Sequence, residues 1–230
     1  MTRTASLTRL VTVSGPKQDR SERTLYRLLD AAERLIAERG LAGLSIPEVV
    51  RRAGSSVGGF YARFADKNQL LRALEERFFL QVTARLDALA DARRWQAASP
   101  VALVEAAVAE LVSVTLARAP MIRVFLFRAA QDPDIREDGL RFQHRVAELL
   151  GPLVLARAGT VRHPDPALAV DLAVQVAFAL MQQHVLLEGI HAAGRRLSEA
   201  ELRREIATLV MSYVGIAPGA GPKRRRARAR

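Results

Sequence analysis

Apolar residues recur at helical spacing along most of the chain, from residue 21 to residue 215. No stretch alternates apolar and polar residues convincingly over the length of a strand. This pattern predicts an all-α fold. The first expected helix follows Ser21 and ends at Gly40. Its apolar side chains fall on one face, which we expect to pack across the two short helices that follow: Leu25, Leu28, Leu29, Ala32, Leu35 and Ile36.

Residues 45 to 71 predict a helix-turn-helix. A capping box between Ser45 and Glu48 is expected to start its first helix, and Gly54 is expected to end that helix in the left-handed conformation. Ser55 and Ser56 supply caps for a second helix over residues 57 to 64. In that helix Phe60 and Phe64 lie one turn apart and face inward.

The outer face of the second helix has the chemistry of a DNA contact. Gly58 and Gly59 each cost roughly 1 kcal/mol relative to alanine inside a helix, which suggests that another molecule approaches the backbone closely. Tyr61 can donate its hydroxyl to a phosphate, Arg63 carries the planar fork suited to guanine or phosphate, and Lys67 adds an ammonium. The alternative is a solvated charged face on a helical hairpin that serves only packing.

The combination of residues between Arg23 and Arg72 resembles the TetR-type (tetracycline-repressor family) transcriptional regulators. The resemblance rests on Ala37-Glu38-Arg39-Gly40, Ser45, Ala53-Gly54, Gly58, Phe60-Tyr61, Phe64, Lys67 and Leu70. It implies a three-helix DNA-binding head whose third helix lies in a major groove, with phosphates at Tyr61 and Lys67. It also implies DNA contacts at Ser45, Ser56, Val57, Gly58, Gly59 and Arg63.

The chain departs from the usual family pattern at three positions of this segment. Val57 replaces a common lysine or other polar residue, Gly59 replaces threonine or alanine, and Ser55 replaces valine. Polar base reading is therefore reduced. We expect Arg63 to be the main hydrogen-bonding reader and Val57 to contact a thymine methyl, with further specificity from DNA shape.

Proline and glycine divide the remainder into further helices. A long helix from Lys67 to about Ala92 is followed by a connector, residues 93–99, and by helices 100–118 and 120–131. A helix from about Ile135 is expected to kink or break at Gly151-Pro152. After a loop over residues 162–166, the last two helices are expected at 167–190 and 198–215.

The last two helices are apolar beyond what one subunit's core needs, and the resemblance implies that they form a four-helix dimer interface. The residues expected there are Ala169, Ala173, Ala177, Ile206, Leu209, Val210 and Tyr213. We therefore predict a homodimer. Two heads facing adjacent major grooves would bind double-stranded DNA at an inverted-repeat operator, with half-sites about one helical turn or more apart.

In this family the helical body usually encloses a pocket for a small-molecule effector. Aromatic and polar side chains at helical spacing would suit a mostly apolar ligand with a few polar anchors. The candidates are Phe125, Phe127, Phe142, His144, Phe178, Met181, Gln182 and His184. Each of them taken alone is more typical of core packing.

The net charge of +11 is concentrated at the two ends of the chain. Residues 1–20 carry +3 and residues 222–230 carry +6, whereas residues 21–75 carry +2 and residues 76–221 are neutral. The arms either add phosphate contacts or are solvated. The expected domains are a basic arm 1–20, a DNA-binding domain 21–66, a ligand-binding and dimerisation domain 67–216, and a basic tail 217–230.

The sequence also favours a cytoplasmic protein with no membrane span. It has no cysteine, and the apolar run from Leu10 to Val13 is too short for a signal peptide. The apolar helix 167–190 carries several polar residues, so we expect it to be buried in protein rather than in lipid.

A metal-dependent helical enzyme is the rival interpretation, because Glu188 and His191 form one E-x-x-H step and His144 precedes Glu148 by one turn. Di-iron bundles need two such steps and two further glutamates. We therefore expect no catalytic residue, metal site or cofactor. A constitutive or activating DNA-binding protein without a small ligand stays open beside the ligand-released repressor.

Overall fold

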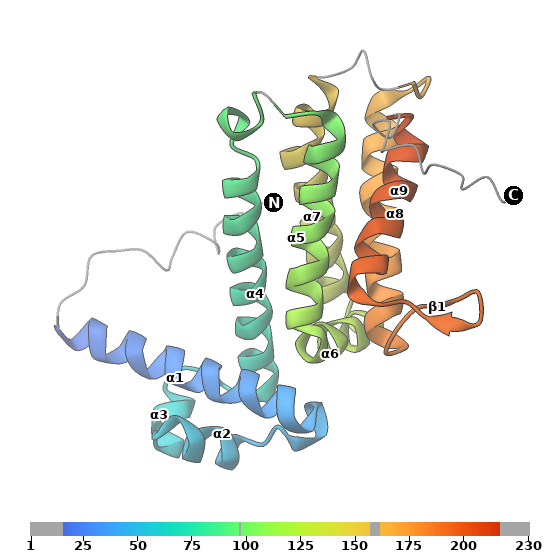
Figure 1. Ribbon diagram of the computed structural model, residues 1–230. Helices are drawn as coiled ribbons and strands as arrows, with labels where there is room; N and C mark the ends of the chain where they lie inside the picture. The colour runs from blue at the N-terminus through green and yellow to red at the C-terminus, as the bar shows by residue number, and fades with distance from the viewer. Residues whose placement is uncertain (1–15, 97, 157–161, 217–230) are drawn as a thin grey trace, which may run out of the picture. The chain divides into compact units, whose positions relative to one another are not determined.

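The computed structural model describes residues 16–96, 98–156 and 162–216. Helices make up nearly all of the regular structure in these ranges, which confirms the predicted all-α class (Figure 1). The chain divides into two compact units, of which the first ends at Glu76 and the second begins at Arg77. This boundary lies inside one continuous helix, α4 (Lys67–Leu89).

The first unit is built on α1 (Pro16–Arg39), which begins before the expected start at Ser21. Its apolar face supplies much of the core, with Leu28, Ala32 and Leu35 completely buried. The short 3-10 helix η1 (Leu41–Gly43) leads into α2 (Ile46–Ala53) and α3 (Val57–Tyr61). α1 packs on α2, and α2 packs on α3. The basic N-terminal arm before Pro16 lies outside the described residues.

The predicted start of α2 is right, but the predicted cap is wrong. Ser45 occupies the N-cap position with no side-chain hydrogen bond, and the Glu48 carboxylate is held by Arg51 and Arg52 instead of reaching back. Three charge-assisted hydrogen bonds from the two arginines outcompete one from a backbone amide. At the other end Gly54 adopts φ 57° and its N–H donates to Arg51 and Val50 carbonyls, as expected for a left-handed cap.

Among the described residues, the second unit contains the end of α4, a short 3-10 helix, five further α-helices and a small β-hairpin. The 3-10 helix η2 (Ala92–Trp95) occupies part of the predicted connector. It is followed by α5 (Pro100–Ala117), α6 (Ala119–Ala129), α7 (Pro133–Leu155), α8 (Pro166–Leu186) and α9 (Glu199–Val214). α5 packs on α9, and α8 lies between α7 and α9. The basic C-terminal tail from residue 217 lies outside the described residues.

A kink or a break was predicted at Gly151-Pro152, and the break does not occur, because α7 continues to Leu155 with Pro152 inside it. Proline in the last turn of a helix removes one hydrogen bond near an end where the helix is about to stop. Packing outweighs that loss. Gly151 is buried, and a Cβ built on it would lie 3.4 Å from Val170 of α8. Leu153 and Val154 are buried as well.

A small β-hairpin joins α8 to α9, where the sequence pattern predicted helix and loop. Its strands, β1 (His191–Ala192) and β2 (Arg195–Arg196), pair antiparallel. Two residues were too few to produce an alternating pattern. α8 consequently ends at Leu186 rather than near Ile190, and Arg123 of α6 donates to the Val185 carbonyl at 3.0 and 3.1 Å.

Two helices, α5 and α8, are long and apolar enough to cross a membrane by length and composition alone. Each packs against several other helices of the second unit. Their buried faces include Leu103, Val108 and Val112 on α5 and Ala169 and Ala173 on α8. We interpret them as core helices, in agreement with the expectation for the segment 167–190.

The strongest local start signal is at α9, where Ser198 and Glu201 form a reciprocal capping box. Arg195 also binds the Glu201 carboxylate, at 2.6 and 2.9 Å. The hydrogen bonds from Arg195 and from the Ser198 backbone and hydroxyl lower the pKa of Glu201 to about 2. Glu201 therefore joins the hairpin to the first turn of α9.

We predict that Glu201→Gln lowers the thermal unfolding temperature most above pH 5. The folded-state pKa of Glu201 lies below its usual value of 4.5. The ionised carboxylate therefore adds stability above that usual value, and this stability disappears as the pH falls toward 2. The measurement is calorimetry between pH 2 and pH 7. Glu205→Gln is the control, since Glu205 pairs with its exposed neighbour Arg204; a parallel loss in that variant would contradict the prediction.

Candidate nucleic-acid interface

The five-residue helix α3 is held by its cap and by two buried rings. The Ser56 hydroxyl accepts a hydrogen bond from the Gly59 N–H at 3.0 Å, as predicted. Phe60 is completely buried and Phe64 nearly so, with 5.3 Å between their ring centroids. Because so short a helix is unstable alone, these contacts fix which side chains it turns outward.

The outward side chains of α3 combine apolar and hydroxyl groups. Val57 is 52% exposed and Tyr61 is 55% exposed, and Ser56 and Gly58 are also exposed. The Tyr61 ring packs edge-on against Phe60, with 5.4 Å between centroids. This contact orients the ring and leaves its hydroxyl on the exposed side of the helix. Such a surface can donate one hydrogen bond and make apolar contacts, which matches the predicted outer face.

Gly58 and Gly59 have different structural settings. A Cβ on Gly59 would lie 2.8 Å from Ser55 Oγ and 3.2 Å from Ser56 Oγ, so a larger residue there would require these two serine side chains to shift. A Cβ on Gly58 would meet only Ser56 Oγ, at 4.0 Å, among the described residues. Gly58 also has an ordinary helical backbone. Contact with the serine side chains therefore favours glycine at position 59, whereas no described atom opposes a Cβ at Gly58.

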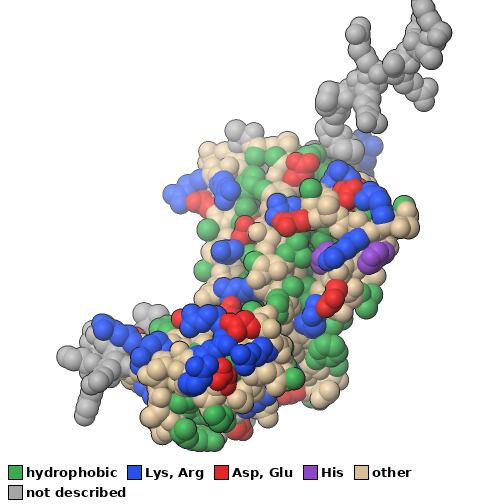
Figure 2. Space-filling view, turned by 60° about the horizontal axis from the view of Figure 1, so that its bottom comes forward, with side chains coloured by type: hydrophobic (Ala, Val, Ile, Leu, Met, Phe, Trp, Pro, Cys, Tyr) green, Lys and Arg blue, Asp and Glu red, His purple; other side chains and the backbone are tan. Residues whose placement is uncertain are grey.

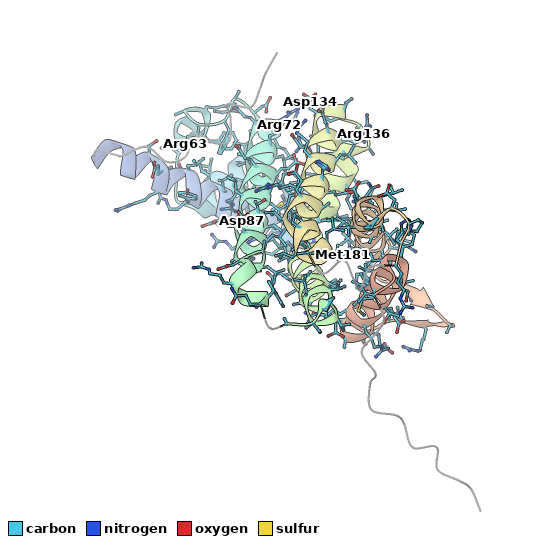
Figure 3. The ribbon with its side chains drawn as sticks, turned by 90° about the horizontal axis from the view of Figure 1, so that it is seen from above. Arg63, Arg72, Asp87, Asp134, Arg136 and Met181 are labelled. Atoms are coloured by element: carbon cyan, nitrogen blue, oxygen red, sulfur yellow. The ribbon has the colours of Figure 1, made fainter. Side chains whose placement is uncertain are left out.

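The Arg63 side chain is not free in solvent but lies between α3 and α1 (Figure 3). Its Nε and Nη2 donate to the Ser21 carbonyl at 3.3 and 3.1 Å, Nη2 also reaches Ser21 Oγ at 3.1 Å, and Nη1 donates to the Gly59 carbonyl at 2.8 Å. The predicted role of Arg63 as a base reader would require these bonds to be exchanged. In this conformation Arg63 joins the C-terminal end of α3 to α1.

Two further predicted contact residues lie at helix starts of the first unit. Lys67 opens α4, and its ammonium donates to the Leu41 carbonyl at 3.4 Å, a weak hydrogen bond that leaves the charge available to an anion. Ser45, at the N-cap of α2, is exposed and keeps its hydroxyl out of the cap. Both groups can therefore donate to a phosphate without first losing a strong internal partner.

An ionic cluster covers α2 and the end of α1. Glu48 receives Arg51 at 2.6 Å and Arg52 at 3.2 Å, and Arg52 also pairs with Glu38 at 2.7 Å. The hydrogen bond from Arg51 is the main cause that lowers the pKa of Glu48 to about 2. Figure 2 shows basic side chains gathered on this unit with acidic ones between them. The pairing fixes the arginines in place and reduces their net field.

The residues predicted for a ligand pocket do not form one cluster. Phe142 stacks on Phe79 and meets Phe178 edge-on, with centroid distances of 4.9 and 5.9 Å. Phe125 is buried against Phe78, whereas Phe127 and His144 are exposed, and Gln182 is half-buried. Met181 and His184 line a narrow gap with Val112, Thr115, Leu116 and Leu202. Sequence spacing gave no signal for Thr115.

The predicted dimer residues also separate into two groups. Ala169, Ala173, Ala177 and Ile206 are buried within the single subunit, because the small side chains allow the helices of the unit to approach each other. Leu209 and Tyr213 are exposed and Val210 is half-buried. The exposed apolar stripe on α8 is the neighbouring one, Leu168, Leu172 and Val176, whose spacing of four residues was present in the sequence.

The E-x-x-H step is broken by the end of α8. Glu188 has φ 56° and pairs with Arg123 at 3.3 Å, and His191 lies in the hairpin strand β1. The two side chains therefore do not share a helical turn. His144 contacts Glu148 at 3.4 Å on the surface of α7. Within the residues that the structure describes, no group of three or more potential ligands is placed to hold a metal ion.

Comparison with known proteins agrees with this geometry. Residues 28–74 match the family model described as bacterial regulatory proteins, tetR family. A 50-residue segment is 42% identical to the HTH-type transcriptional regulator YvdT of Bacillus subtilis, itself uncharacterized. That alignment covers 22% of this chain and only 26% of the relative, so the similarity lies in a segment the size of the helix-turn-helix unit.

Solved structures extend the similarity to the fold of the remainder. A candidate TetR-family transcriptional regulator from Mesorhizobium loti has a TM-score of 0.68 at 20% identity, covering 84% of this chain and 96% of the other. A TetR transcription regulator from Haloarcula marismortui has a TM-score of 0.66 at 14% identity, covering 84% and 97%. At such identities these matches show a shared fold.

We predict that Arg63→Ala lowers the free energy of unfolding by about 1 kcal/mol. The variant loses the partly exposed hydrogen bonds that join the end of α3 to α1. Thermal unfolding measures this loss. Arg27→Ala is the matched control, since Arg27 bonds Thr24 on its own helix. If stability is unchanged and the preferred bases change, Arg63 is instead a base reader. If DNA affinity falls equally for all sequences, Arg63 is a phosphate contact.

We predict opposite effects of Gly58→Ala on stability and on binding to duplex DNA. The methyl group has space in the free protein, so the helix should gain about 0.5–1 kcal/mol. The same methyl group should weaken DNA binding if the backbone approaches base edges there. Unfolding and binding titrations on one preparation test both effects. Equal or tighter DNA binding by the variant would place the groove contact elsewhere.

Proposed function

We propose that this chain, as one of the TetR-type transcriptional regulators, represses transcription. It binds an inverted-repeat operator as a homodimer, and a small, largely apolar ligand releases the dimer from the DNA. The observation that carries the DNA-binding part is the exposed surface of α3. Its inward residues are aromatic and buried, while Val57, Gly58 and Tyr61 face outward. A helix with this surface fits a major groove.

The proposed contacts divide into positioning and reading. Tyr61, Lys67 and Ser45 donate to phosphates, which fix the register without carrying sequence information. Val57 contacts a thymine methyl, and the backbone at Gly58 and Gly59 approaches the base edges. Ser56 caps α3 and lies beside them. Arg63 contributes to reading only when DNA offers better acceptors than the Ser21 and Gly59 carbonyls.

The proposed dimer uses the exposed apolar stripes of α8 and α9. Leu168, Leu172 and Val176 recur every four residues on α8, and Leu209 and Tyr213 do so on α9. The two helices lie side by side in the second unit (Figure 1). Exposed apolar stripes on two neighbouring helices are typical of a subunit interface. An isologous pair would place two copies of it in contact about a two-fold axis.

Ligand release would be transmitted through α4. This helix begins at Lys67, within the proposed DNA surface, and its later residues Phe78 and Phe79 pack on Phe125 and Phe142 of the second unit. A ligand that changes this aromatic packing would move α4 and with it the spacing of the two heads. Since the helix is covalently continuous, no separate coupling element is needed.

A constitutive or activating regulator without a ligand is the alternative. It would use the same α3 surface and the same dimer, and it would differ only in lacking a response to small molecules. A helical metal-dependent enzyme is disfavoured by the broken E-x-x-H step and by the family, whose members are generally not enzymes.

Selection of bound sequences from random duplex DNA tests the proposal. We expect an enriched inverted repeat with half-sites about one helical turn or more apart. Leu172→Glu with Leu209→Glu should give a monomer by light scattering at micromolar concentration and abolish the enrichment. Leu140→Glu, at a leucine on α7 that is more exposed than either of these, should leave both unchanged. A wild-type monomer, or binding that follows salt concentration alone, would overturn the proposal.

A further inference from the structure

A narrow gap lies between α5, α8 and α9 in the second unit. It is lined by Val112, Thr115 and Leu116 of α5, Met181 and His184 of α8, and Leu202 of α9. The gap is too narrow to hold a water molecule. Four of its six side chains are apolar in character, and the two others present polar atoms that have poor partners.

The imidazole of His184 is the more unusual of the two polar groups. The residue is only 9% exposed, and its Nδ1 is fully enclosed without a hydrogen-bond partner among the described residues. Buried polar atoms in native proteins nearly always have a partner. Burial, assisted by the nearby charge of Arg196, lowers the pKa of His184, so the ring is neutral at neutral pH. A neutral ring presents Nδ1 either as donor or as acceptor.

Thr115 is the second polar group, and its hydroxyl has only a weak hydrogen-bond partner. Its hydroxyl donates to the Met181 sulfur at 3.5 Å, and a thioether is a weak acceptor. Met181 lines the gap together with Thr115 and His184. It is buried, on the face of α8 directed at the core (Figure 3). A methionine side chain has several rotatable bonds and adapts its shape at low cost. Opening of the gap requires Met181, which is only 2% exposed, to change rotamer.

We infer that this gap is a binding site for a small uncharged molecule with an apolar body and one hydroxyl group. The hydroxyl bonds His184 Nδ1 and relieves Thr115 of its weak partner, while the body lies against Val112, Leu116 and Leu202 after Met181 moves. This inference rests on the proposed ligand-released function, and it names the chemistry of the ligand and the residues that select it.

The charge and shape of the lining exclude other ligand classes. An ammonium group would meet a neutral imidazole and the field of Arg196, and would lose its hydration without an anionic partner. A carboxylate would be attracted by the field of Arg196, but it would lose its hydration in a gap whose other walls are mostly aliphatic. A pure hydrocarbon would fill the space but leave Nδ1 unsatisfied, which costs affinity relative to a hydroxyl compound of the same size.

Phenol and toluene are a suitable pair of probes, since they differ by a hydroxyl and a methyl group on the same ring. We expect phenol to bind the full-length protein about fivefold more tightly than toluene, the preference that one net hydrogen bond supplies. The chain has four histidines, so nitrogen NMR of labelled imidazoles resolves each. Phenol should shift His184 Nδ1 and leave His144, His163 and His191 unchanged.

Two variants separate hydrogen bonding from space. His184→Leu should remove the preference for phenol, whereas Met181→Ala should enlarge the gap, tighten both probes and keep the preference. His144→Leu, at an exposed histidine, is the matched control. No binding by either wild type or Met181→Ala would overturn the inference, as would a phenol preference that depends on His144.

The two proposals can fail separately. Release of operator DNA is measured in the same titrations by fluorescence anisotropy of a labelled duplex. Phenol binding at His184 without any DNA release would retain the site and contradict the ligand-released function. DNA release by compounds that leave the His184 signal unmoved would retain the function and overturn the site.

Discussion

The burial of Phe60 is the constraint on which the rest of the first unit depends. α3 has only five residues and contains two glycines, so it has almost no intrinsic helical stability. Its direction is set because one ring is inserted completely into the core and a second, Phe64, packs beside it. The Ser56 cap at the start of α3 and Arg63 after its end then stabilise the position of the helix. The exposed surface is thus defined from inside the unit.

The helix-turn-helix was predictable because its local signals agree with its tertiary packing. Ser56, Gly54, Phe60 and Phe64 each have the role that their spacing indicated. The signal failed where two local patterns compete for one side chain. Ser45 and Glu48 have the spacing of a capping box, but arginines at the next turn take the carboxylate, whereas Ser198 and Glu201 with the same spacing form the box.

The surface of the second unit was less predictable, because periodicity identifies an apolar face without saying what covers it. The alanines of α8 were assigned to an outer interface, yet they are the residues that allow close packing inside the subunit. Adjacent leucines and valines, larger and one position away, remain exposed. Similarly, Arg63 has the side chain of a base reader, but the fold brings it to Ser21, which is far away in sequence and accepts its hydrogen bonds.

The contrast between the two glycines of α3 bears on how such a protein can change its target over evolution. A side chain at Gly59 would crowd Ser55 and the cap residue Ser56, so a substitution there requires these side chains to shift. Gly58 is under no such requirement from the described structure. Side chains can be sampled at that position without first acquiring a compensating mutation in the core. Under the proposed contacts, new DNA-sequence preferences are therefore more accessible at Gly58 than at Gly59.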